Sequence, residues 1–146
     1  MTFQITILGC GSSGGVPRVG GDWGACDPAN PKNRRRRCSI LVERIAGDER
    51  TVVLVDTSPD LREQLLMTGT RRLDGILLTH AHADHVHGID DVRPLVIKMK
   101  RRIGVYMDQP TDDLVRSRFA YIFETPAGSS YPPLLDPVSY THLRAH

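Results

Sequence analysis

A cluster of three histidines and one aspartate, directly after a short apolar segment, constrains this chain more than any other feature of its sequence. The apolar segment, Gly75–Thr79, has the length and composition of a strand. The residues that follow it are His80, His82, Asp84 and His85. A polar surface loop that gathers such residues by chance is the alternative, and the preceding strand favours a built site.

The spacing of the cluster suits metal binding. Side chains two residues apart on an extended chain point to the same side, so His80 and His82 can hold one ion through their ring nitrogens. Asp84 and His85 are adjacent, so the chain must turn there to bring both to a second ion. Imidazole and carboxylate ligands suit Zn²⁺, and also Mn²⁺ or Fe²⁺. We therefore expect two divalent metal ions, zinc or manganese, that activate a water molecule.

The composition is that of a globular protein with one domain. The 146 residues are 40% hydrophobic and 25% charged, and a net charge of +2 gives no argument for a nucleic-acid partner. No apolar stretch approaches the roughly 18 residues of a membrane span, and we see no secretory signal. Three cysteines, Cys10, Cys26 and Cys38, are an odd number, which favours a reduced, cytoplasmic setting.

Apolar patterning predicts a series of short strands. A polar loop from Val16 to about Arg37 separates the first two, and a hairpin turn around Gly47 and Asp48 joins the second to the third. The expected strands are Phe3–Leu8, Cys38–Arg44, Arg50–Val55, Gly75–Thr79 and Ile103–Met107.

Two helices are expected from their end signals. Ser58 is the expected N-cap of the first, which ends at Gly69 and carries Leu61, Leu65 and Leu66 on one face. The second is expected over Thr111–Glu124, with Thr111 as its cap. Val138–His146 shows neither helical nor strand periodicity, and we interpret it as a non-native tail.

The motif T-H-A-H-A-D-H resembles the H-x-H-x-D-H signature of the metallo-β-lactamase superfamily. Three further segments resemble the same family: the glycine-rich turn Leu8–Pro17, the strand-end aspartate in Val55–Asp60, and Gly88–Leu95 after the metal motif. The likeness extends over roughly residues 1–137. It is greatest to the phosphoribosyl 1,2-cyclic phosphate phosphodiesterase branch.

This resemblance implies the α/β class, as an αββα sandwich of two facing sheets. Residues 1–137 would supply mainly its first half, truncated after about residue 137, and 138–146 the tail. Family members complete the two-metal site with later ligands, for which His142 and His146 in the tail are not expected to substitute. We therefore predict that this chain alone is inactive. We also predict that it is poorly soluble, because one apolar sheet face lacks a cover.

The resemblance also implies roles for single residues. Asp84 would bind metal and orient the attacking water, which makes it the expected catalytic residue. Asp56 would steady the metal loop through hydrogen bonds, and a simple turn former is the alternative. Cys26 is the one cysteine in a loop that holds an accessory zinc in some relatives, so no such site is expected here. Cys26 and Cys38 are expected to be buried thiols.

Several other residues allow two interpretations. Arg34–Arg37 either contacts phosphate or forms a solvated loop. The basic residues from Lys98 to Arg102 are expected at a solvated helix end or turn. His87 is expected to be a loop histidine, with a substrate contact as the alternative. Trp23 either lines the mouth of the site or anchors its loop.

The function implied by motif and resemblance is a metal-dependent hydrolase. The leading hypothesis is a phosphodiesterase that acts on a small cyclic or nucleotide-like phosphate ester through a metal-activated water. A non-catalytic or cofactor-biosynthesis relative of the pyrroloquinoline quinone type and a tRNA 3′-processing endonuclease are the alternatives. The expected partner is a small phosphorylated substrate, without membrane or nucleic acid, and a homodimer stays open.

Overall fold

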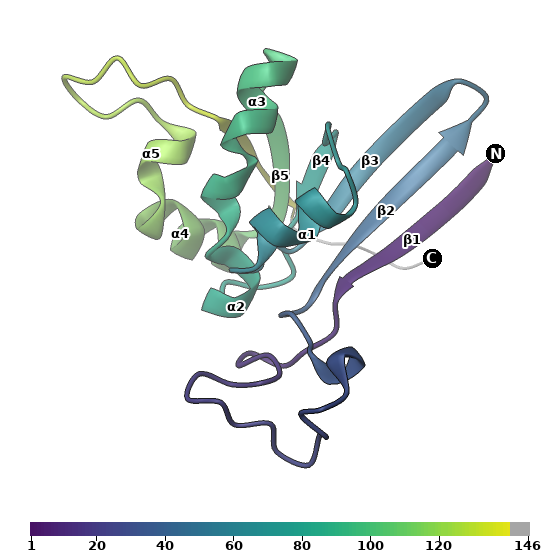
Figure 1. The fold of residues 1–146 in the computed structure, drawn as a ribbon. Helices are drawn as coiled ribbons and strands as arrows, with labels where there is room; N and C mark the ends of the chain where they lie inside the picture. The colour runs from purple at the N-terminus through teal and green to yellow at the C-terminus, as the bar shows by residue number, and fades with distance from the viewer. Residues whose placement is uncertain (141–146) are drawn as a thin grey trace.

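Six strands lie side by side in the order in which they occur in the sequence (Figure 1). The computed structural model describes residues 1–140. Strands β1 to β3 are antiparallel neighbours, whereas β3 to β6 run parallel, so β3 to β6 all end at the same edge of the sheet. The strands are β1 Thr2–Gly9, β2 Ser39–Ala46, β3 Glu49–Val55, β4 Gly75–Leu77, β5 Ile103–Asp108 and β6 Leu135–Tyr140.

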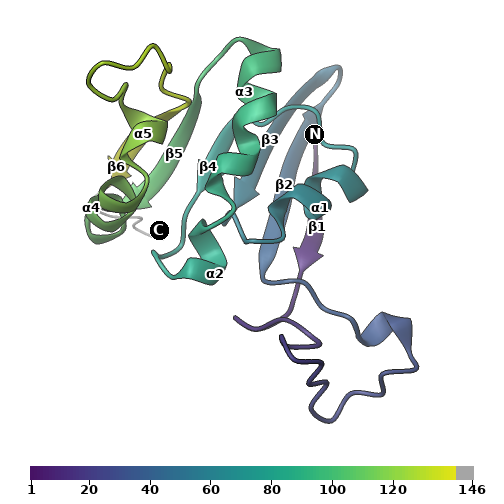
Figure 2. The ribbon, with the colours of Figure 1, turned by 60° about the vertical axis from the view of Figure 1, so that its left-hand side comes forward.

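The helices cover one face of this sheet (Figures 1 and 2). Four buried residues from neighbouring strands, Leu41, Leu54, Ile76 and Val105, lie in register and form the floor of the core under the helices. The helices are α1 Leu61–Met67, α2 Ala83–Val86, α3 Arg93–Met99, α4 Gln109–Arg118 and α5 Ala120–Phe123, with 3-10 turns η1 Pro31–Asn33 and η2 Ile89–Val92. The α/β class expected from the sequence is confirmed.

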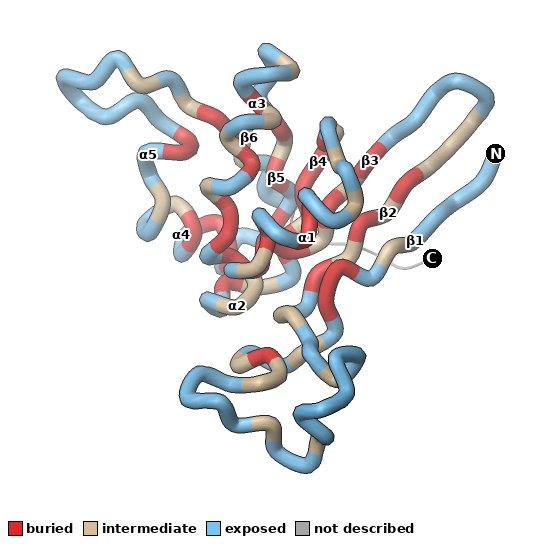
Figure 3. The backbone as a smooth tube through the Cα atoms, in the orientation of Figure 1, coloured by how far each residue is buried: buried red, intermediate tan, exposed pale blue. Residues whose placement is uncertain are grey.

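The opposite face of the sheet has no helical cover within residues 1–140. One apolar or aromatic residue from every strand lies in register across it, and β1 is coloured as exposed along most of its length (Figure 3). Ile5 and Ile7 are each 65% exposed. The row consists of Ile7, Ile40, Val55, Leu77, Tyr106 and Val138. An exposed apolar sheet face, as expected from the sequence, is therefore present.

The first helix starts later than predicted. Its N-cap is Asp60, and Ser58 is no cap: its hydroxyl donates to Gln64 Oε1 over 2.8 Å and accepts from the Asp60 amide. Leu66 is 62% exposed, so its expected place on the apolar face is wrong. The helix stops as predicted, since Gly69 follows its C-cap with a φ of 63°.

The second predicted helix is two helices. Asp108 caps α4 by accepting from the Thr111 amide over 2.9 Å, so Thr111 is a buried residue inside the helix and no cap. The chain breaks at Phe119, where φ is −128° and ψ is 37°, before α5 begins. No bounds were predicted for α3, although a helix end or turn was expected at Lys98–Arg102 and Pro94 lies in its first turn.

Two further expectations need correction. Cys38 is exposed and Cys26 is half-buried, so neither is a buried thiol. Residues 138–140 continue β6 and pair with β5, so the expected lack of regular structure from Val138 onward is wrong there. The rest of the predicted tail, with His142 and His146, lies outside the described residues. No helix within residues 1–140 has the length and apolar character required to cross a membrane.

Asp74 joins three segments on the loop before β4. Its carboxylate accepts from the Val52 amide over 2.8 Å and pairs with Arg72 and with Arg101, the latter over 2.9 Å. Burial raises the pKa of Asp74, but the hydrogen bonds from Arg72, Val52 and Arg101 outweigh it, so the pKa lies below its ordinary value. The ionised carboxylate therefore stabilises the fold.

We expect Asp74→Asn to lower the free energy of unfolding by about 1–3 kcal/mol at pH 7. A lowered folded-state pKa contributes stability above the unfolded pKa, and this contribution is lost as the pH falls through the folded pKa. The gap between wild type and variant should therefore shrink below about pH 4. Urea unfolding at several pH values measures it, with Asp48→Asn in the exposed hairpin turn as control. A gap that does not depend on pH would contradict this role.

The two sheet faces should respond differently to polar substitution. We expect the double variant Ile5→Thr and Ile7→Thr to change stability by less than about 0.5 kcal/mol and to reduce aggregation. Leu41→Thr, on the covered face where Leu41 is 3% exposed, should cost about 3 kcal/mol. Urea unfolding and light scattering measure both effects. An equal loss of stability from both changes would show that the open face is covered.

Candidate metal centre

The histidine cluster lies at the carboxyl end of the parallel strands. Asp56 follows β3 directly, and the segment 79–88, here called the metal loop, follows β4. Because β3 and β4 are parallel neighbours, both segments leave the sheet at the same edge. This is the edge at which open α/β sheets generally place their ligands. The loop of residues 10–38 projects beyond the same end of the sheet (Figure 1).

The metal loop brings the three predicted histidines together. The ring of His80 lies 4.6 Å from that of His82 and 4.1 Å from that of His85, measured between ring centroids. The short helix α2 supplies the turn that was expected at Asp84 and His85. Asp84 Oδ2 lies 3.2 Å from His85 Nε2. His82 is exposed, and the other three are half-buried, so the cluster is open to solvent on one side.

Asp56 connects this loop to the sheet. It is 3% exposed and has a φ of 62°, a left-handed conformation that aspartate tolerates better than most residues. One carboxylate oxygen accepts from the Thr79 amide over 2.8 Å, and the other lies 2.7 Å from His85 Nδ1. Thr79 Oγ1 also donates to the carboxylate. The expectation that Asp56 steadies the loop through hydrogen bonds agrees with these contacts.

These contacts determine which ring nitrogens are free. A carboxylate only accepts, so His85 Nδ1 donates to Asp56, and Nε2, beside Asp84 Oδ2, is the nitrogen left for a metal. The single proton of Thr79 Oγ1 is donated to Asp56, so His80 Nδ1, 3.0 Å away, donates to that oxygen. His80 Nε2 is then also an acceptor. Sequence reasoning assigned no role to Thr79, although it directly precedes the motif.

Backbone contacts hold the metal loop against the segment after β3. The Thr57 amide donates to the His85 carbonyl over 2.8 Å, and the Gly88 amide donates to the Thr57 carbonyl over 2.9 Å. A Cβ on Gly88 would lie 1.9 Å from the Ser58 carbonyl oxygen. Only glycine therefore allows the end of the loop to approach this closely.

The imidazole and carboxylate groups of the cluster are ligand types that suit a divalent metal. His85 Nε2 and Asp84 Oδ2 are separated by 3.2 Å, close to the spacing of two ligands that each lie about 2.1 Å from one ion. The rings of His80 and His85 pack against each other, and within residues 1–140 no three histidine, cysteine or acidic side chains converge on one point. The four predicted ligands are therefore gathered in one loop, but as they stand they do not converge on a single point.

The arginine run is partly structural. Arg37 pairs with Asp60 through its backbone amide and its guanidinium, at distances of 2.8–3.0 Å. The Gly11 amide donates to the Arg36 carbonyl over 2.7 Å, so the run lies against the glycine-rich turn. Arg34 and Arg35 are exposed, and the Arg34 guanidinium lies 5.8 Å from the centre of the Trp23 ring.

The basic residues Lys98–Arg102 and His87 are not part of the histidine cluster. Lys100 follows α3 in the left-handed conformation common at helix ends, which agrees with the expected helix end. Arg101 pairs with Asp74 and Arg102 with Asp136, so these two arginines are not simply solvated charges. His87 is exposed, and its ring stands edge-on to Phe119.

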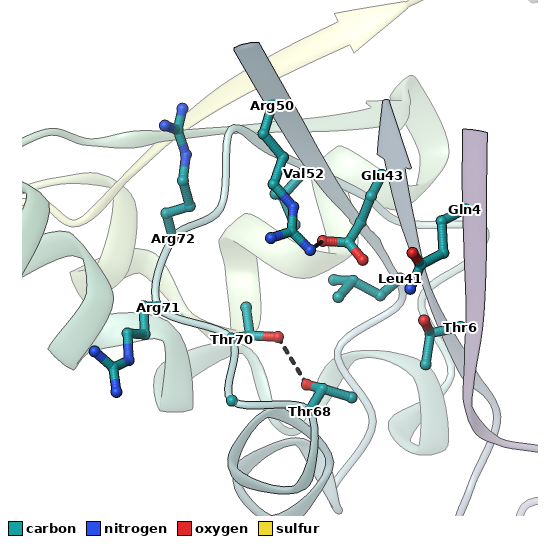
Figure 4. Close-up of a pocket in the computed structure, with 11 residues that line it drawn as sticks. Gln4, Thr6, Leu41, Glu43, Arg50, Val52, Thr68, Thr70, Arg71 and Arg72 are labelled. Atoms are coloured by element: carbon teal, nitrogen blue, oxygen red, sulfur yellow. Dashed lines mark hydrogen bonds and ion pairs between the residues drawn. The ribbon is translucent and has the colours of Figure 1, made fainter. Parts of the chain in front are cut away.

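A pocket of about 490 Å³ lies elsewhere, between β1 to β3 and the loop after α1 (Figure 4). Its most buried charged residue is Glu43, which pairs with Arg50, and Gln4 and Thr6 line the β1 side. No residue of the metal loop lines it. We therefore base the chemistry on the histidine cluster.

Comparison with known proteins gives the family of this chain. Residues 51–142 match the family described as beta-lactamase superfamily domain. The chain is 41% identical over 135 residues to an octanoyltransferase of Porphyromonas gingivalis, a match that covers 91% of this chain and 26% of that protein. It is 48% identical over 61 residues to a ribonuclease Z of Bradyrhizobium sp., a match that covers 40% of this chain and 19% of that protein. It is 28% identical over 138 residues to coenzyme PQQ synthesis protein B of Xanthomonas oryzae, a match that covers 80% of this chain and 44% of that protein.

Solved structures show the same fold. A diphosphatase of the PhnP family superposes with a TM-score of 0.79 and 35% identity, over 97% of this chain and 52% of that one. Human tRNase Z, short form, superposes with a TM-score of 0.55 and 19% identity, over 96% and 45%. The chain thus spans about half the length of these structures and less than half of the curated relatives.

We expect Asp56→Asn to lower the affinity for Zn²⁺ by about 10- to 100-fold. Asparagine keeps the left-handed backbone but removes the charge that fixes the His85 ring. Competition with a chromophoric chelator measures the affinity, and Asp48→Asn, far from the metal loop in sequence and exposed, is the matched control. Equal affinities for the two variants would contradict the role of Asp56.

Proposed function

Since the chain belongs to the β-lactamase superfamily, we propose that it supplies the metal-binding part of a phosphodiesterase that hydrolyses a small cyclic or nucleotide-like phosphate ester. The observation that carries the proposal is the gathering of His80, His82, Asp84 and His85 at the ends of β3 and β4. Sequence identity of 35% to a diphosphatase over 97% of the chain supports a phosphate ester as substrate.

The four residues of the cluster would hold two divalent ions, zinc or manganese. Such ions lower the pKa of bound water and stabilise the negative charge that develops on the phosphate. His80 and His85 present Nε2, because Thr79 and Asp56 occupy their Nδ1 atoms. His82 is the exposed member and borders the solvent from which substrate enters.

Asp84 has the position of the catalytic residue in this proposal. Its carboxylate is half-buried beside His85 Nε2, so it can act as a ligand with one oxygen and accept a hydrogen bond from the attacking water with the other. A carboxylate that holds a water in line with the phosphorus atom lowers the entropic cost of attack.

The exposed arginines Arg34 and Arg35 belong to the loop of residues 10–38, which projects beyond the same end of the sheet (Figure 1). Guanidinium groups bind phosphate oxygens in a bidentate manner, so this loop would attract a phosphorylated substrate. Arg37 is engaged by Asp60 and belongs to the fold instead.

A ribonuclease Z activity is the second candidate. It is favoured by 48% identity over 61 residues to a ribonuclease Z. Residues 10–38 project beyond the sheet (Figure 1), and this segment would offer a contact surface for a substrate larger than a small phosphate ester. Cleavage of a 3′-extended tRNA precursor, in preference to a small phosphodiester, would favour this candidate. Metal binding without turnover of any phosphate ester would favour a non-catalytic relative such as PQQ synthesis protein B.

Four protein ligands cannot fill two metal sites that each need about four. We therefore expect the 146-residue chain to show little hydrolysis of bis(4-nitrophenyl) phosphate with Mn²⁺ or Zn²⁺. A longer form of the protein that also supplies the remaining ligands should be active. In that protein, His80→Ala and Asp84→Asn should each lower kcat by at least about 100-fold, because both remove a metal ligand.

Release of nitrophenolate, followed by absorbance, measures this activity. Asp48→Asn is the control, since Asp48 is exposed in the hairpin turn between β2 and β3 and lies outside the metal loop. Full activity of His80→Ala would refute the mechanism, and an active 146-residue chain would refute the need for further ligands.

A further inference from the structure

The corner between α4 and α5 contacts the metal loop and its continuation at three points. Arg118 Nη1 donates to the Ala81 carbonyl. The ring of Phe119 lies edge-on to His87, with 5.8 Å between centroids. Beyond the loop, the Tyr121 hydroxyl donates to Asp90 Oδ1 over 3.0 Å. Residues more than 30 positions apart in sequence are thereby joined.

The break between α4 and α5 allows all three contacts to form at the same time. In an unbroken helix, residues 118, 119 and 121 would spread over about 160° of the surface. The break at Phe119 turns the chain, and the three side chains then reach the same segment. The sequence pattern alone had indicated one continuous helix.

Arg118 contacts the peptide between two predicted ligands. Ala81 is 7% exposed and separates His80 from His82. This stretch belongs to no helix or strand, so no ladder of backbone hydrogen bonds fixes the Ala81 carbonyl. A rotation of that peptide would change the relative position of the two rings, which now lie 4.6 Å apart.

The helix that presents Arg118 is well anchored. Val115 is fully buried in the core, Asp108 caps the first turn, and the buried Asp112 pairs with Arg116 over 2.7 Å. A donor on a fixed element holds its acceptor more firmly than a donor on a mobile loop.

We propose that Arg118 is a positioning residue for the metal centre, which acts by fixing the Ala81 peptide so that His80 and His82 face the same ion. This inference rests on the proposed metal-binding role of the two histidines. Arg118 itself touches neither metal nor substrate.

Co²⁺ titration of the 146-residue chain, followed by visible absorption, tests the proposal. We expect Arg118→Met, which keeps the aliphatic stem but removes the donor, to lower Co²⁺ affinity about 10-fold and to alter the ligand-field bands. Arg118→Lys should restore most of the affinity, because it returns a cationic donor. The control Arg62→Gln removes an exposed arginine that pairs only with its neighbour Glu63, and it should behave as wild type.

The outcomes separate the two proposals. Unchanged Co²⁺ bands in His80→Ala would refute the metal site itself. Bands that are lost in His80→Ala but unchanged in a folded Arg118→Met would overturn the positioning role alone. Circular dichroism verifies folding. If Arg118→Met does not fold, Arg118→Gln, whose shorter side chain cannot reach the Ala81 carbonyl, tests the same contact: about tenfold weaker binding supports the proposal, and wild-type binding overturns it.

Discussion

The hydrogen bonds of Asp56 connect the sheet to the metal loop, and the arrangement of the site depends on them. Its backbone amide donates to the Leu77 carbonyl over 2.8 Å, which fixes the residue to the end of β4. Its carboxylate then contacts Thr79 and His85, the first residue of the metal loop and a predicted ligand within it. One buried group therefore determines both where the metal loop starts and which nitrogen His85 presents.

The first five strands were predictable because their signal is local, whereas β6 was not predicted. Alternation in Phe3–Leu8 and the turn at Gly47 need no knowledge of distant residues, and β1 and the hairpin lie within two residues of their expected bounds. The helix ends were not. Serine is a residue type that often caps helices, but the Ser58 hydroxyl donates a hydrogen bond to the Gln64 side chain instead. The break at Phe119 accompanies contacts with a loop some 30 residues earlier, and no local pattern carries that information.

The same distinction applies to the site. His80, His82, Asp84 and His85 are close in sequence, so their proximity could be inferred from spacing. Thr79 and Arg118 act through partners on other segments, and their residue types are common in surface positions. The pairing of Arg37 with Asp60 likewise separates one structural arginine from a run that is uniform in sequence.

The agreement between strand order and sequence order has a consequence for synthesis. After the β1–β2 pair has formed, each later strand that leaves the ribosome finds an existing edge on which to add. Most strand pairs are therefore closed over modest sequence separations, which keeps the entropic cost of each step low. The segment between β1 and β2, residues 10–38, holds no α-helix, whereas α-helices lie between the later parallel strands, so we expect the pairing of β1 with β2 to limit the rate of sheet assembly.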